Sequence, residues 1–147
     1  MKTLYSLHLF LFLALTIPLT GHSEEENSQT FGEYSVHYSI FPSTFLTADV
    51  ARAYGIKRSK HENLINVFVS KEDKKGGVKV NINGNARNLM QQQQPFQFQE
   101  ILEDDTVYYI APFKVSSDEI LHFEVICTLP DTGKELKVKF TKKIYKN

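Results

Sequence analysis

The sequence predicts a mainly β protein: a single immunoglobulin-like antiparallel β-sandwich of about seven strands with one short α-helix at about residues 47–54. Two observations predict this fold class. Apolar and polar residues alternate over several short segments, which is typical of strands with one buried face. Clusters of turn-forming residues separate these segments. We therefore expect one core enclosed between two sheets.

The first 23 residues have the layout of a secretory signal peptide. Lys2 precedes an apolar run from Leu4 to Leu19, and small residues follow. Cleavage after Ser23 is predicted, with cleavage after Gly21 as the alternative. An uncleaved anchor competes with this interpretation, but the apolar run is shorter than the roughly 18 residues that a spanning helix needs. Without these 23 of the 147 residues, 124 remain, which suits one exported domain that is not inserted in the membrane.

The predicted β-sandwich domain covers residues 31–147. Residues 24–30 (EEENSQT) precede it and are expected to form a disordered tail, because they are polar and have no periodicity. The first strand is expected to begin at Tyr34, since every second residue from there is apolar. The buried face of this strand would carry Tyr34, Val36, Tyr38 and Ile40.

The other predicted strands follow at short intervals. They cover residues 62–72, 78–86, 106–113, 119–129 and 134–145, and a less regular strand begins near Phe96. Residues 62–72 are apolar on both faces, which predicts a central strand, and the turn after them predicts a hairpin with residues 78–86. Residues 134–145 carry lysines on the outer face, which predicts an edge strand protected against pairing with other chains.

The predicted helix is only two turns long. Thr47 is a favourable N-cap, Asp49 places a carboxylate in the first turn, and Gly55 supplies the left-handed residue at which helices commonly end. A helix this short is unstable alone, so packing must hold it. We expect Val50 and Tyr54, which are four residues apart, to dock on one end of the sandwich.

Composition and motifs exclude several classes of function. The 17 basic and 17 acidic residues give no net charge, which argues against a nucleic-acid partner. Cys127 is the only cysteine, so no intramolecular disulfide exists, and we expect its thiol in the core. The G-x-S-x-G, P-loop, H-E-x-x-H and C-x-x-C motifs do not occur. We therefore expect no enzymatic activity and no cofactor.

Histidines and carboxylates give no complete metal site. His37 and His122 each lie on the polar face of a predicted strand, so they could be neighbours on one sheet and bind a transition metal. Two ligands are fewer than the three or four that metal sites need, so no metal site is predicted. The acidic residues between Glu100 and Asp105 are expected to form a turn and not a calcium or glycosidase site.

A basic loop precedes the predicted central strand. The candidate residues for binding a ligand or partner lie in this loop and on the helix before it, and they are Arg52, Tyr54, Arg58, Lys60 and His61. The Arg58 guanidinium could bind a carboxylate through two hydrogen bonds, which a lysine cannot do. A solvated loop that only connects two elements is the competing interpretation.

The chain also resembles a known family. The passage FGEYSVHYSIFPSTFLTADVARAYGIKRSKHENLINVFV, together with VYYIAPF and VKFTKKIY, is similar to the DUF4426 family of gammaproteobacterial periplasmic proteins, a domain of unknown function. The most distinctive part runs from His37 to Asn66, where STFL, YGI and RSK stand in the family's order. The resemblance implies a signal-bearing, single-domain periplasmic β-protein with no established activity, and it carries over no catalytic residue.

Two hypotheses about function follow. The first is a secreted or periplasmic non-enzymatic module that binds a protein or cell-envelope component, either through the corner from Thr44 to Lys60 or by adding a partner's strand to a sheet edge. The alternative is a periplasmic protein that binds a small ligand or anion through the basic loop, with Arg52, Arg58 and Lys60 at its centre. An enzyme is the weakest hypothesis, because only the polar residues near the helix suggest one.

Overall fold

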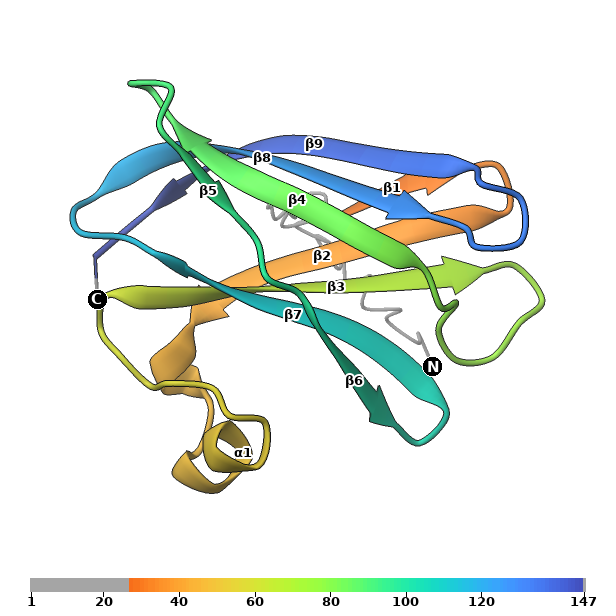
Figure 1. Ribbon diagram of the computed structural model, residues 1–147, viewed down its shortest axis with the longest axis horizontal. Coiled ribbons are helices and arrows are strands. Elements are labelled where there is room, and N and C mark those ends of the chain that lie inside the picture. Colours follow the sequence, from red (N-terminus) through yellow and green to blue (C-terminus); the bar gives the residue numbers. More distant parts are fainter. Residues whose placement is uncertain (1–26, 147) are drawn as a thin grey trace, which may run out of the picture.

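The computed structural model describes residues 27–146 and shows an immunoglobulin-like β-sandwich of two antiparallel sheets with a short α-helix. The predicted fold class is confirmed. Figure 1 shows the strands of the two sheets stacked, with the helix α1 projecting at the lower edge of the view. Residues 1–23 of the predicted signal peptide and residues 24–26 of the predicted tail lie outside the described residues.

Within residues 27–146 the strands form a five-stranded and a four-stranded sheet. The five-stranded sheet has the order β1 (Ser28–Phe31), β2 (Tyr34–Pro42), β3 (Glu62–Lys71), β7 (Thr106–Lys114) and β6 (Gln99–Glu103). The four-stranded sheet has the order β5 (Gln93–Pro95), β4 (Asn81–Asn88), β8 (Glu119–Thr128) and β9 (Glu135–Ile144). The predicted central strand is confirmed by β3, and the predicted edge strand is confirmed by β9.

The predicted disordered tail is wrong for residues 28–30. These residues belong to β1, which pairs with the first half of β2. Strand β1 needs no apolar alternation, because its backbone supplies the hydrogen-bonding partners of the β2 edge. The Gln29 side chain also reaches the other sheet, where Nε2 donates a hydrogen bond to the carbonyl oxygen of Lys139 (3.0 Å).

The predicted hairpin between β3 and β4 is also wrong, because the two strands lie in different sheets. The connection runs beside Val69, whose carbonyl oxygen accepts a hydrogen bond from the Val78 amide (2.8 Å), and then crosses to the four-stranded sheet. Gly77 makes this path possible, since a Cβ atom there would lie 2.8 Å from the carbonyl oxygen of Val107. Alternation identifies the buried face of a strand, but it does not identify the neighbouring strands.

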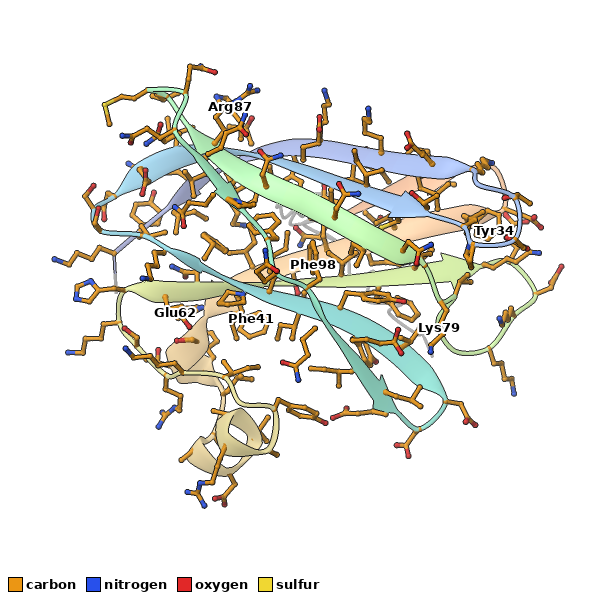
Figure 2. The ribbon with its side chains drawn as sticks, in the orientation of Figure 1. Tyr34, Phe41, Glu62, Lys79, Arg87 and Phe98 are labelled. Atoms are coloured by element: carbon orange, nitrogen blue, oxygen red, sulfur yellow. The ribbon has the colours of Figure 1, made fainter. Side chains whose placement is uncertain are left out.

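The core lies between the sheets and is rich in aromatic rings. Phe140 stacks on Tyr38 on one side (ring centroids 4.1 Å apart) and on Phe123 on the other (4.7 Å), so these rings join the two sheets. Such pairs contribute about 0.5–1.5 kcal/mol each beyond the burial of their area. Cys127 is buried, as predicted. Figure 2 shows Phe98, from the connection between β5 and β6, lying between the sheets.

Helix α1 spans Ala48–Ala53, begins with the predicted N-cap and follows a 3₁₀ turn at Ser43–Phe45. The Thr47 hydroxyl accepts a hydrogen bond from the Val50 amide (3.3 Å). The prediction that Tyr54 docks is confirmed, whereas the prediction for Val50 is wrong, because that side chain is 40% exposed. The position that faces the protein is occupied by Ala51, the buried residue of the helix. Across residues 27–146, the structure contains no helix with the length and hydropathy to cross a membrane.

Candidate functional site

The two arginines predicted to bind a ligand are engaged with their own segments of the chain. Arg52 forms an exposed ion pair with Asp49, three residues earlier on the helix (3.7 Å). Arg58 donates a hydrogen bond from Nη2 to the carbonyl oxygen of Thr44 (3.2 Å). The Arg58 contact holds its guanidinium at the backbone of the corner, whereas Arg52 and its partner remain exposed on the helix. Among residues 27–146, no hydrogen bond or ion pair links Arg52 to Arg58, and the two side chains share no partner.

The other three predicted residues have different surroundings. Tyr54 packs on the apolar cluster under the helix and donates a hydrogen bond to the Glu103 carboxylate of β6 (2.5 Å). That hydrogen bond raises the pKa of the Tyr54 hydroxyl. Lys60 and His61 have exposed side chains, and the His61 carbonyl oxygen accepts a hydrogen bond from the Val115 amide (3.0 Å). Tyr54 therefore anchors the corner to the edge of the five-stranded sheet.

A polar groove lies on the outer face of the four-stranded sheet. It is an open hollow of about 300 Å³ that crosses all four strands. Its polar lining consists of Asn85, Arg87, Gln93, His122, Glu124, Lys139 and Thr141. Strand register arranges most of these side chains in two rows, Asn85–Glu124–Lys139 and Arg87–His122–Thr141. We call this hollow the polar groove.

Positive charge gathers around one carboxylate in the polar groove. Lys139 and Glu124 form an ion pair in which Nζ and Oε2 are 2.9 Å apart. This hydrogen bond lowers the pKa of Glu124, and the charges of Lys137 and Arg87 lower it further. The lining of the groove holds two cations, Arg87 and Lys139, against the one carboxylate of Glu124, so it keeps an excess of positive charge that attracts anions.

Arg87 is a cation of the polar groove without a direct partner. Its side chain is exposed and forms no hydrogen bond or ion pair with the described residues. Beside it, His122 Nδ1 and Thr141 Oγ1 are hydrogen-bonded (2.8 Å), which fixes the imidazole ring. Figure 2 shows Arg87 near the end of β4, on the solvent side of the sandwich. A guanidinium in this position can bind a carboxylate through two parallel hydrogen bonds.

The suggested pairing of His37 and His122 as metal ligands is wrong. His37 lies on β2 of the five-stranded sheet, whereas His122 lies on β8 of the four-stranded sheet. His37 is instead hydrogen-bonded through Nε2 to the Ser70 hydroxyl (2.9 Å). In the part of the chain that the structure describes, no three His, Cys, Asp or Glu side chains lie close enough to hold a metal ion.

Comparison with known families identifies the chain. The sequence profile described as a domain of unknown function, DUF4426, matches residues 28–147. The chain belongs to the DUF4426 family. This match confirms the resemblance seen in the sequence. No curated protein matches the chain.

Solved structures share the fold of this DUF4426 protein. A DUF4426 family protein from Pseudomonas aeruginosa PAO1 has a TM-score of 0.74 and 32% sequence identity, over 82% of this chain and 94% of that chain. FetP of uropathogenic Escherichia coli strain F11 has a TM-score of 0.60 at 13% identity in two structures. One is a copper-bound variant, matched over 79% of this chain and 92% of its own. The other is FetP as isolated after recombinant expression in the periplasm of E. coli, matched over 80% and 92%. The likeness to FetP shows the fold alone.

Sequence reasoning missed the polar groove of this DUF4426 protein. The alternation in β9 already indicates that Lys137 and Lys139 face outward, and the alternation in β4 indicates the same for Asn83 and Asn85. No sequence pattern indicates that β4 and β9 lie on either side of β8. The groove depends on that arrangement, because its two rows cross all three strands.

Proposed function

We propose that this DUF4426 protein is a non-enzymatic binding protein of the periplasm, and that it holds a carboxylate-bearing ligand in the polar groove. One observation carries the proposal: the lining of the polar groove holds two cations, Arg87 and Lys139, and only one carboxylate, Glu124, with which Lys139 is paired. The Arg87 guanidinium has no direct partner among the described residues. The periplasmic location is supported by the signal-like sequence of the first 23 residues.

The dimensions of the polar groove favour a small ligand. Its volume of about 300 Å³ lies at the lower end of the range for small-molecule sites, about 300–1,000 Å³. Lys139 is already paired with Glu124, so Arg87 would make the main contact with the carboxylate. The amides of Asn85 and Gln93 could hydrogen-bond the rest of the ligand, because each offers both a donor and an acceptor.

The ionisation state of Glu124 supports a role in binding without catalysis. A general acid or base works best when its pKa lies near the working pH. The Lys139 hydrogen bond instead lowers the pKa of Glu124 from an ordinary value that is already acidic, so the carboxylate stays ionised at neutral pH. Glu124 is therefore better suited to hold a cation in the groove than to transfer a proton at neutral pH.

Calorimetric titration with acetate, succinate and glutamate tests the proposal. We expect saturable binding of at least one carboxylate, and we expect Arg87→Gln to weaken it by about tenfold or more, since hydrogen bonds to a charged group contribute about 1.5–3 kcal/mol. Arg58→Gln is the matched control, because it removes a guanidinium from the basic loop and leaves the groove intact. We expect the control to bind like the wild-type protein.

Two results would contradict the proposal. If Arg58→Gln weakens binding and Arg87→Gln does not, the basic loop is the site and the assignment to the polar groove is wrong. If no carboxylate binds but inorganic phosphate does, with a loss in Arg87→Gln, the groove binds anions but the carboxylate assignment is wrong. Thermal unfolding of both variants should match that of the wild-type protein, because both arginines are exposed.

A further inference from the structure

The outer face of the five-stranded sheet carries aromatic side chains on three neighbouring strands. His37 of β2 lies opposite Phe68 of β3, and their ring centroids are 5.6 Å apart. Phe68 is followed by Tyr108 of β7, whose ring centroid is also 5.6 Å away. On β6, Ile101 lies opposite Tyr108 and ends the row. We call His37, Phe68 and Tyr108 the aromatic row.

The aromatic row remains accessible to solvent. His37 is exposed, and the other two rings are partly buried. The corner from Thr44 to Lys60 covers a neighbouring part of the same face, where it buries Leu64 and Ile110. Gly77 leaves room for the central ring, because a Cβ atom there would lie 3.0 Å from Phe68 Cε2. The row is therefore partly open to solvent beside the corner, and the planes of neighbouring rings are tilted by 35° and 36°.

Uncharged polar side chains lie on both sides of the aromatic row. They are Thr30, Ser35 and Ser70 on one side and Ser39 and Asn66 on the other. The hydroxyls of Thr30 and Ser35 are hydrogen-bonded (3.0 Å). The Ser70 hydroxyl is hydrogen-bonded to His37 Nε2 (2.9 Å), so the hydroxyl side also orients the first ring of the row. Hydroxyls and amides of this kind both donate and accept hydrogen bonds.

We propose that the aromatic row binds an uncharged oligosaccharide, whose sugar rings pack along the exposed side of the row. One face of a pyranose ring presents C–H groups that pack on an aromatic ring, while the hydroxyls at its edge need hydrogen-bonding partners. The row supplies rings at two equal steps of 5.6 Å, and the flanking hydroxyls and the Asn66 amide supply the partners. The lack of charge on these residues favours a neutral ligand, because a charged ligand would lose hydration without gaining an ion pair.

NMR titration with neutral hexasaccharides tests the proposal. The three probes are β-1,4-linked glucose, β-1,4-linked N-acetylglucosamine and α-1,4-linked glucose. We expect at least one to bind saturably and to shift the signals of Phe68 and Tyr108. Tyr108→Leu should weaken that binding about tenfold, because it removes the ring and keeps apolar contact with Ile101. Tyr145→Leu is the matched control, since Tyr145 is 60% exposed and follows β9 of the other sheet; it should bind like the wild-type protein.

Three results would overturn the proposal. The first is that none of the hexasaccharides binds saturably. The second is that Tyr145→Leu weakens binding as much as Tyr108→Leu, which would show that the row is not the site. The third is that sedimentation shows a wild-type dimer and a Tyr108→Leu monomer, which would make the row an interface between two copies of the chain. Arg87→Gln should leave oligosaccharide binding unchanged, so this proposal and the carboxylate proposal can fail separately.

Discussion

The two outer faces of the sandwich differ in chemistry although both rest on one core. The face of the four-stranded sheet carries charges, with Arg87 and Lys139 near Glu124. The face of the five-stranded sheet carries the aromatic row, flanked by uncharged hydroxyl and amide groups. Side chains of a strand alternate between its two faces, so the inner faces can be uniformly apolar while the outer faces differ freely. One small domain can therefore present two unlike binding surfaces.

The largest expected effect comes from a change to the core that both faces share. Phe123 is 2% exposed and stacks on Phe140, so Phe123→Ala should lower the free energy of unfolding by about 3–5 kcal/mol. Phe45→Ala is the matched control, because Phe45 is 76% exposed and its loss should change stability by less than about 0.5 kcal/mol. Urea denaturation followed by circular dichroism and by tyrosine fluorescence measures both. Two separate transitions would contradict a shared core.

Salt concentration should change ligand affinity at one face and not at the other, and this effect is of intermediate size. Raising sodium chloride from about 0.05 to about 0.5 M shortens the screening length from more than 10 Å to less than 8 Å. We expect the dissociation constant of the carboxylate ligand to rise several-fold, because Arg87 attracts it through charge. The dissociation constant of the oligosaccharide should not change. Calorimetry measures both dissociation constants. If they depend equally on salt, the proposed difference in charge between the two binding surfaces is wrong.

The smallest expected effect concerns the carboxylate inside the polar groove. Glu124→Gln removes the negative charge that engages Lys139, so the affinity for carboxylates should rise a few-fold. Glu100→Gln is the matched control, because it breaks an equally short ion pair with Lys79 (2.9 Å) that does not line the groove. Calorimetry compares the two variants. A weaker affinity in Glu124→Gln would show that Glu124 contributes to the ligand site.

The sequence predicts the parts of the fold that depend on local patterns. The alternation of apolar and polar residues predicts β2, β3, β7, β8 and β9 and the buried face of each, because the apolar side of a strand packs in the core. The Thr47 cap is also local, since its hydroxyl bonds an amide three residues later. These elements are predicted correctly because the patterns that specify them are local.

The sequence does not predict what depends on partners distant in the chain. Strand β1 has polar residues and is held by pairing with β2, so its composition resembles a tail. Strand β4 alternates clearly, yet it joins the other sheet and forms no hairpin with β3. Both candidate surfaces arise in the same way. The polar groove joins β5, β4, β8 and β9, and the aromatic row joins β2, β3 and β7.

A single NMR experiment tests most directly whether the faces are separate binding surfaces. The ¹⁵N-labelled protein is titrated with the carboxylate that binds most tightly and then, at saturation, with the neutral oligosaccharide. We predict that the first ligand shifts the amides around Arg87 and Glu124, and that the second shifts those around Phe68 and Tyr108 without displacing the first. Shifts in one common set of residues, or displacement of one ligand by the other, would contradict two separate surfaces.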